Sequence, residues 1–204
     1  MNKRGKSLWS LKFNTATLVL IPAAIGINYL GKLFADVLKL PLWLDSIGTC
    51  LAAVLAGPIV GAICGAANNI IYGLTANPIS TVYALTNVAI GLVVGILAHF
   101  GMMKNIKLCI LTALVAGAAA VVVSTPLNII FWGGTTGNVW GDAVYAWFVA
   151  HHAPLAIASF LDEVVVDLPD KIAVILIVFA ITKSLPKSLT ALYHSSDEIE
   201  SLDD

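Results

Sequence analysis

Two adjacent amide side chains interrupt an apolar stretch of the sequence, "CGAANNIIYG", residues 64–73. Asn68 and Asn69 can each donate and accept hydrogen bonds. Further amides, Asn87 and Asn128, lie in later apolar stretches. A polar group in an apolar environment is costly unless it has a partner. These amides therefore indicate either a polar binding site or hydrogen bonds that tie helices together.

Aromatic and charged side chains occur near the same apolar stretches. The segment "LPLWLDSIGT" carries Trp43 and Asp45, and "DLPDK" carries Asp170 and Lys171. Aromatic faces with a few directed polar groups are typical of a pocket for a small molecule. The candidate substrate-binding residues are Trp43, Asp45, Asn69, Tyr72, Asn87, Asn128, Trp132, Asp170 and Lys171.

Several of these residues also have structural interpretations. Asp45 suits the N-cap of a helix, and Asp170 suits the positive end of a helix dipole. Trp43 is also typical of the aromatic belt at a membrane interface. Asn68 is interpreted as a link between helices, whereas Asn69 is interpreted as a substrate contact.

The sequence contains no catalytic or metal-binding motif that would indicate an enzyme. His151 and His152 could form a metal site with Asp162, Glu163 and Asp167, but adjacent histidines point in different directions on a helix, and no HxxxH or HExxH spacing is present. Phosphate-binding loops, serine-hydrolase elbows and dinucleotide fingerprints are absent from the sequence. We expect no catalytic residue, no metal and no cofactor in this chain.

The composition indicates a membrane protein. Of the 204 residues, 59% are hydrophobic and 11% charged, whereas soluble domains are about 45–50% apolar and about 25% charged. The chain therefore has too little polar surface to coat a water-soluble globule. It also lacks a basic patch with interleaved aromatic residues, which argues against a nucleic-acid partner. Cys50, Cys64 and Cys109 lie in apolar runs and are expected to be small buried residues.

Six apolar segments are expected to cross the membrane as helices, since a span needs roughly 20 apolar residues. The N-terminal segment is interpreted as a retained first span. The Gly57-Pro58 pair divides one long apolar block into two helices. The short second helix leaves five spans as the alternative. The expected spans are residues 15–35, 45–56, 58–74, 81–102, 108–131 and 169–185.

The distribution of charge favours six spans with both termini in the cytoplasm, because cytoplasmic loops are rich in Lys and Arg. Five spans would place Lys104 and Lys107 on the opposite side from the basic N-terminus. With six, one side holds eight of the eleven basic residues: Lys3, Arg4, Lys6, Lys12, Lys104, Lys107, Lys183 and Lys187. The sequence thus predicts an all-α integral membrane protein, a multi-pass bundle in contact with lipid.

The expected organisation is one membrane domain, residues 1–188, followed by an acidic cytoplasmic tail, residues 189–204. A long outer loop, residues 132–168, is expected between the last two spans, with an apolar piece that lies on or dips into the membrane. Asp162, Glu163 and Asp167 fall in this loop. Lys32 and Asp36 are also placed among the outer segments.

Helical geometry predicts the helix face and the membrane depth at which the amides lie. Asn68 and Asn69 flank the face formed by Gly57, Gly61 and Gly65, since each helical residue turns by about 100°. Small residues at this spacing allow close helix packing. Asn69 lies about 16 Å from the inner side, in the outer half of a core about 30 Å thick. A polar interior open to the outside is therefore expected.

These features resemble the S-components, the substrate-binding membrane subunits of energy-coupling factor (ECF) vitamin transporters. The resemblance covers residues 15–186 and is carried by "LPLWLDSIGTCLAAVLAGPIVGAICGAANNIIYG", "NVAIGLVVGILA", "WGGTTG" and "LPDKIAVILIVFAITKSLP". It implies a six-helix bundle in a bacterial cell membrane, which binds a vitamin under residues 39–44, 75–80 and 132–140. The loaded subunit would topple beside a transmembrane scaffold subunit (the T subunit), and two partner ATPase subunits would use the ATP.

Many S-components carry an Ala-x-x-x-Ala pattern in the first span for docking to the scaffold. That pair is absent here, and Gly31 and Ala35 have the spacing instead. They are the candidate docking positions.

The leading hypothesis is capture of a small ring-containing vitamin or precursor, of vitamin B6 or pyrimidine type. A cobalamin-specific S-component is the first alternative. A membrane sensor module and a stand-alone secondary transporter are alternatives from other classes.

Overall fold

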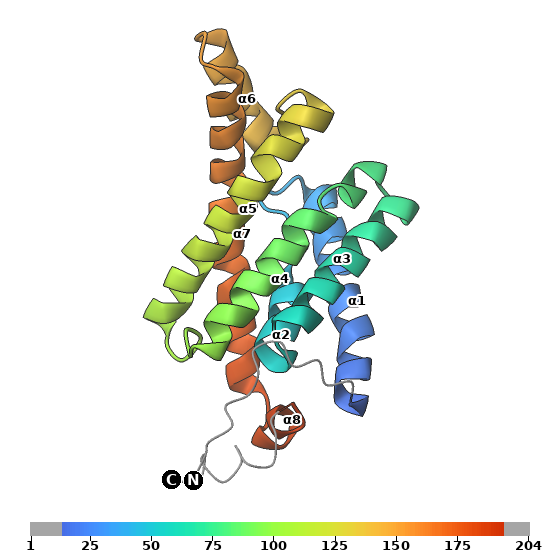
Figure 1. Ribbon diagram of the computed structural model, residues 1–204. Helices are drawn as coiled ribbons and strands as arrows, with labels where there is room; N and C mark the ends of the chain where they lie inside the picture. Colours follow the sequence, from blue (N-terminus) through green and yellow to red (C-terminus); the bar gives the residue numbers. More distant parts are fainter. Residues whose placement is uncertain (1–13, 194–204) are drawn as a thin grey trace.

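The computed structural model describes residues 14–193, and every regular element among them is helical (Figure 1). In chain order these elements are α1 (Thr15–Leu38), α2 (Ile47–Ala56), α3 (Pro58–Thr75), the 3₁₀ turn η1 (Pro78–Thr81), α4 (Ala84–His99), α5 (Ile106–Trp132), α6 (Val139–Ala150), α7 (Leu155–Ser184) and α8 (Lys187–Ala191). The predicted acidic tail lies outside the described residues from position 194 onward, as do the basic residues 3–12.

Three of these helices, α1, α3 and α5, are long and apolar enough to cross a membrane. The apolar helices α2 and α4 are shorter; the ten residues of α2 extend about 15 Å. Helix α7 has 30 residues but carries several charges. The chain is thus an all-helical membrane protein, while the number of spans and the side on which the termini lie stay predictions.

Helix α7 corrects the expected long outer loop. Residues 155–184 form one continuous helix with Pro169 in its interior, and residues 139–150 form α6. The prediction that the last helix starts at Pro169 was wrong, because proline often begins a helix but is tolerated inside membrane helices, where neighbouring groups satisfy the freed carbonyl. Pro22 and Pro126 also lie inside helices. Helix α6 packs against the first part of α7, and together they extend beyond the bundle at the top of Figure 1.

Glycines bring α3 and α4 close together. A Cβ atom at Gly65 would lie 2.8 Å from the Asn87 carbonyl oxygen, and one at Gly91 would lie 2.6 Å from the Ala62 nitrogen. On the next side of α3, a Cβ at Gly61 would lie 2.5 Å from the Ala53 Cβ of α2. The predicted role of the glycine stripe in close helix packing is therefore confirmed for Gly61 and Gly65, whereas Gly57 lies between α2 and α3 with nothing within 4 Å of an added Cβ.

An asparagine of α1 fixes the start of α2. The N-cap residue of α2, Ser46, makes no capping hydrogen bond with its side chain. Instead the Asn28 Oδ1 accepts hydrogen bonds from the backbone N–H groups of Gly48 (2.7 Å) and Thr49 (3.3 Å). The Asn28 Nδ2 donates to the Thr49 hydroxyl at 2.8 Å. The free N–H groups at the start of a helix need such acceptors, so α1 positions α2 directly.

The half of the bundle nearest the start of α1 is apolar. Its core consists of small and aliphatic side chains from α2, α4, α5 and α7, among them Cys50, Val94, Cys109, Ala116 and Val174. Cys64 lies in a smaller cluster with residues of α1. All three cysteines are free and buried, as predicted. This apolar base leaves the polar side chains gathered in the other half.

Close packing at Gly91 can be tested by adding one methyl group. We expect Gly91→Ala to destabilise the protein by about 1–3 kcal/mol, because the new Cβ meets backbone atoms of α3 that cannot rotate away. The measurement is the melting temperature of purified protein in detergent. Gly26→Ala on α1 is the matched control, since nothing lies within 4 Å of its added Cβ. Equal melting temperatures for the two variants would contradict the proposed contact.

Candidate functional site

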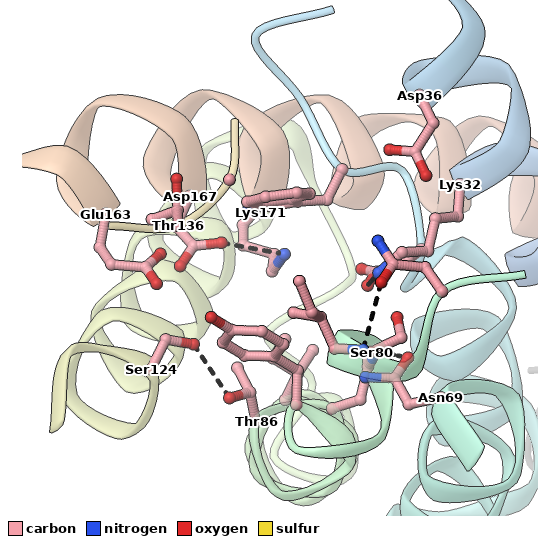
Figure 2. Close-up of a pocket in the computed structure, with 18 of the residues that line it drawn as sticks. Lys32, Asp36, Asn69, Ser80, Thr86, Ser124, Thr136, Glu163, Asp167 and Lys171 are labelled. Atoms are coloured by element: carbon pink, nitrogen blue, oxygen red, sulfur yellow. Dashed lines mark hydrogen bonds and ion pairs between the residues drawn. The ribbon is translucent and has the colours of Figure 1, made fainter. Parts of the chain in front are cut away.

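A cavity of about 290 Å³ lies at the end of the bundle opposite the start of α1 and α8. Its walls come from the C-terminal parts of α1, α3 and α5, the start of α4, η1, the middle of α7 and two connections. The lining residues are Lys32, Asp36, Lys39, Trp43, Asp45, Asn69, Asn77, Ile79, Ser80, Tyr83, Thr86, Asn87, Ile90, Ser124, Thr136, Gly137, Glu163, Asp167 and Lys171. Figure 2 shows Glu163, Asp167 and Lys171 on one side and Asn69 and Ser80 on the other.

Buried ion pairs on α7 support one wall of the cavity. The Lys171 ammonium pairs with the Asp170 carboxylate and lies 3.5 Å from the Asp167 Oδ1. All three side chains are buried. A buried charge is tolerated only with partners, so this group forms a mutually dependent set.

Asp170 also holds the connection between α1 and α2. Its Oδ1 accepts hydrogen bonds from the backbone N–H groups of Trp43 (3.0 Å) and Leu44 (2.8 Å). Leu44 and Lys39 both have a φ of 53°, in the left-handed region that side chains other than glycine rarely adopt. The Asp170 carboxylate therefore stabilises a backbone shape that the local sequence does not favour.

The same connection is held at its other side by α6. The Trp140 Nε1 donates to the Lys39 carbonyl at 2.9 Å, and the Asn138 Nδ2 donates to the Leu40 carbonyl at 3.1 Å. Asn138 also caps α6 through the Trp140 N–H. Residues 39–44 are thus held between α6 and α7.

Lys32 lies at the centre of a second charged group. Its ammonium is 3.3 Å from the Asp45 Oδ2 and lies over the aromatic rings of Trp43 and Tyr72, 5.7 Å and 5.2 Å from their centroids. The Tyr72 hydroxyl donates to the Asp36 Oδ2 at 2.7 Å. Ammonium groups over aromatic faces are attracted electrostatically. Lys32 is therefore fixed in the cavity wall by one carboxylate and two rings.

Amides form the opposite wall. The Asn69 Oδ1 accepts hydrogen bonds from the Asn87 Nδ2 at 3.0 Å and from the Asn68 Nδ2 at 3.2 Å. All three side chains are buried, but Asn68 does not line the cavity. These bonds join α3 to α4 at the level of the cavity.

Five of the nine predicted site residues line the cavity: Trp43, Asp45, Asn69, Asn87 and Lys171. Three others lie behind the wall and hold residues that reach it. Tyr72 bonds to Asp36, Asp170 pairs with Lys171, and Asn128 joins the Tyr83 hydroxyl to the Glu163 carboxylate. Trp132 is partly buried and does not line the cavity.

The structure also corrects the placement of several charges. Asp162, Glu163 and Asp167 were assigned to a long outer loop, yet all three are buried on α7. Glu163, Asp167 and Lys171 are each four residues apart, which places them on one helical face. This spacing could have identified them if the helix had been continued through Pro169.

Two further predictions concern the surroundings of the site. His151 lies exposed at the end of α6, and no group of three or more His, Cys, Asp or Glu side chains suited to a metal occurs in residues 14–193. Gly31 and Ala35 were wrong as a docking pair. Ala35 is buried, and Leu44 covers Gly31 so closely that a Cβ there would collide with its backbone.

Comparison with known proteins identifies a family. A family model described as "ECF transporter, substrate-specific component" matches residues 16–193. A search of curated proteins gave no match, and no solved structure matched either.

The role of Asp170 can be tested by removing its charge. We expect Asp170→Asn to destabilise the protein by about 3–5 kcal/mol, because Lys171 then loses its nearest carboxylate. Cleavage by trypsin after the exposed Lys39 should also become faster, since the 39–44 connection is less firmly held, while cleavage after Lys104 in a distant turn should not change. Melting temperature and limited proteolysis in detergent measure both effects.

Asp36→Asn is the control for this experiment. Asp36 lines the same cavity, but its carboxylate accepts a hydrogen bond from Tyr72, which an amide oxygen can also accept. Equal effects of the two substitutions would show that the charge of Asp170 does not support the connection.

Proposed function

The chain belongs to the substrate-specific components of ECF transporters, and we propose that it captures a small ring-containing vitamin or vitamin precursor in the cavity described above. Proteins of this family are substrate-binding transport subunits and not enzymes; ATP hydrolysis lies in partner subunits. The family implies interaction with the ECF scaffold and ATPase subunits and with a small-molecule substrate.

The observation that carries the proposal is the cavity itself. It combines the aromatic side chains of Trp43 and Tyr83 with buried amides and carboxylates, and it lies at the end of the bundle away from the apolar core. Pockets for small molecules are mostly about 300–1,000 Å³ and are lined by apolar surface with a few directed polar groups. A cavity of about 290 Å³ supports a single ring with small substituents. Cobalamin, with its corrin ring and nucleotide tail, is much less compatible with this volume.

We also propose how the bundle is oriented in the membrane and how it delivers the substrate. The bundle has six spans with both termini in the cytoplasm of a bacterial cell, so the cavity opens to the outside. The loaded subunit topples beside the scaffold subunit, driven by two ATPase subunits, and this chain needs no cofactor. The exposed side chains Leu18, Val19, Ile27, Leu30 and Phe34 make the outer face of α1 apolar along its length. That face is available to lipid or to the scaffold, unlike the covered Gly31 and Ala35.

Partner subunits can be tested by purification from the native membrane in mild detergent. We expect the tagged full-length chain to copurify with a transmembrane scaffold subunit and ATPase subunits, identified by mass spectrometry. A tag-only membrane preparation is the control. Uptake that persists after deletion of the ATPase subunits would contradict the proposal and favour a stand-alone secondary transporter. Copurification with a signalling partner alone would favour a sensor module.

Substrate capture can be tested by thermal shift on the purified chain with a vitamin panel. The panel contains vitamin B6 forms, a pyrimidine precursor of thiamine, and cobalamin. We expect one small ring compound to raise the melting temperature, and Asn69→Ala to weaken its binding about 5- to 150-fold, since a lost hydrogen bond to a buried amide costs about 1–3 kcal/mol. The control, Thr112→Val, removes a buried hydroxyl of α5 outside the cavity and should leave binding unchanged. If no compound shifts the melting temperature, the capture function is refuted.

A further inference from the structure

Four buried polar atoms of the cavity residues lack a hydrogen-bond partner within residues 14–193. They are the Asn69 Nδ2, the Asn87 Oδ1, the Ser80 Oγ and the Asp167 Oδ2. Their residues are at most 2% exposed. Most buried polar groups in folded proteins are partnered, and each that is not costs about 1–3 kcal/mol. Five other unpartnered atoms belong to described residues that do not line the cavity, so these four are the candidates for hydrogen bonds to the molecule that fills it.

The amide wall has a defined pattern of donors and acceptors. The Asn69 Oδ1 is already used by two donors, the Asn68 and Asn87 Nδ2 groups, which leaves the Asn69 Nδ2 free to donate. Asn87 has used its Nδ2 and is left with an acceptor, Oδ1. Turning all three amides over together would exchange these roles but would still leave Asn69 and Asn87 with one acceptor and one donor between them; the Asn68 Oδ1 also lacks a partner, but Asn68 does not line the cavity. The wall therefore requires a ligand edge that carries both an acceptor and a donor.

Resting on the proposed function, we propose that the substrate is an amino-substituted nitrogen heterocycle whose ring nitrogen and adjacent amino group bind Asn69 and Asn87. The ring nitrogen accepts from the Asn69 Nδ2, and the amino group donates to the Asn87 Oδ1. Ser80 supplies a hydroxyl beside this edge. On the opposite side of the cavity, the Asp167 Oδ2, beside the Glu163 carboxyl, accepts from a hydroxyl or amino substituent at the far end of the ring (Figure 2).

The charged groups of the cavity argue against an anionic substrate. Both buried ammonium groups already have carboxylate partners, Lys171 with Asp170 and Asp167, and Lys32 with Asp45. A carboxylate offers only acceptors, so it would leave the Asn87 Oδ1 without a donor. A pyridine of vitamin B6 type has no amino group beside its ring nitrogen and would satisfy only one amide. The amide wall therefore favours an aminopyrimidine over a pyridine of vitamin B6 type, although both are small ring compounds of the kind proposed above.

The test compares two ligands that differ in one group. The probes are the aminopyrimidine precursor of thiamine and its analogue in which a methyl group replaces the amino group. Binding to the purified full-length chain is measured by calorimetry. We expect the analogue to bind at least about 100-fold more weakly, because a site built to accept a hydrogen bond rejects a ligand that lacks the donor. Equal affinities, or no binding of the aminopyrimidine, would overturn the inference.

A substitution at Asn87 tests whether the amide wall causes the difference in affinity between the amino and methyl ligands. Asn87→Ala should reduce the ratio of the two affinities to less than about tenfold, since the acceptor that reads the amino group is gone. Thr112→Val should keep the full ratio. A merely structural role for Asn87 would lower both affinities together and leave their ratio unchanged, which would contradict the assignment. If Asn87→Ala does not fold, the ligand pair with the unchanged chain decides alone.

The outcome also distinguishes this inference from the proposed function. Binding of pyridoxine or another vitamin without binding of the aminopyrimidine would refute the donor–acceptor edge but leave vitamin capture intact. Absence of binding to every vitamin in the panel would refute both.

Discussion

The buried carboxylate of Asp170 connects parts of the chain that are far apart in sequence. One oxygen accepts the N–H groups of Trp43 and Leu44, and the other pairs with Lys171, which also lies near Asp167. In an environment of low polarity each of these groups depends on the others, because an unpaired charge or N–H would be left without water. The 39–44 connection and the middle of α7 therefore form the cavity wall together.

Packing and hydrogen bonding are divided between the two halves of the bundle. In the apolar half, glycines let α3 approach α2 and α4 until backbone atoms meet, and small side chains fill the remaining space. In the other half the helices are joined by polar side chains, such as Asn28 between α1 and α2 and Asn128 between Tyr83 and Glu163. The polar side chains that line the cavity lie in this second half, which makes it the natural place for a substrate.

A subunit that binds a substrate leaves some polar groups of its cavity without partners when the cavity is empty. Here Lys171 and Lys32 are paired with carboxylates, while the Asn69 Nδ2, the Asn87 Oδ1, the Ser80 Oγ and the Asp167 Oδ2 at the cavity have no hydrogen-bond partner within residues 14–193. The free energy lost by leaving these atoms unpartnered in the empty protein is regained when a complementary ligand binds. Selectivity for the ligand therefore resides in a few atoms of the cavity wall.

Much of the architecture and part of the site follow from the sequence because they depend on short-range periodicity. Apolar length, the glycine spacing and the 100° helical turn indicate a helical membrane protein and place Asn69 beside the packed face of α3. The same reasoning failed at Pro169, since local propensity suggests a helix start there, whereas packing against α5 and α6 continues α7 through it.

Tertiary structure alone decided which polar residues reach the cavity. Tyr72, Asn128 and Asp170 have the residue types of ligand contacts, yet each is occupied by a neighbour from another element. Lys32, Ser80 and Asp167 have no distinctive local motif, yet they line the wall. The sequence determined on which helical face a residue lies. Only the tertiary structure decided which residue it meets there, because that depends on how distant helices are rotated and spaced and on which buried charges find each other.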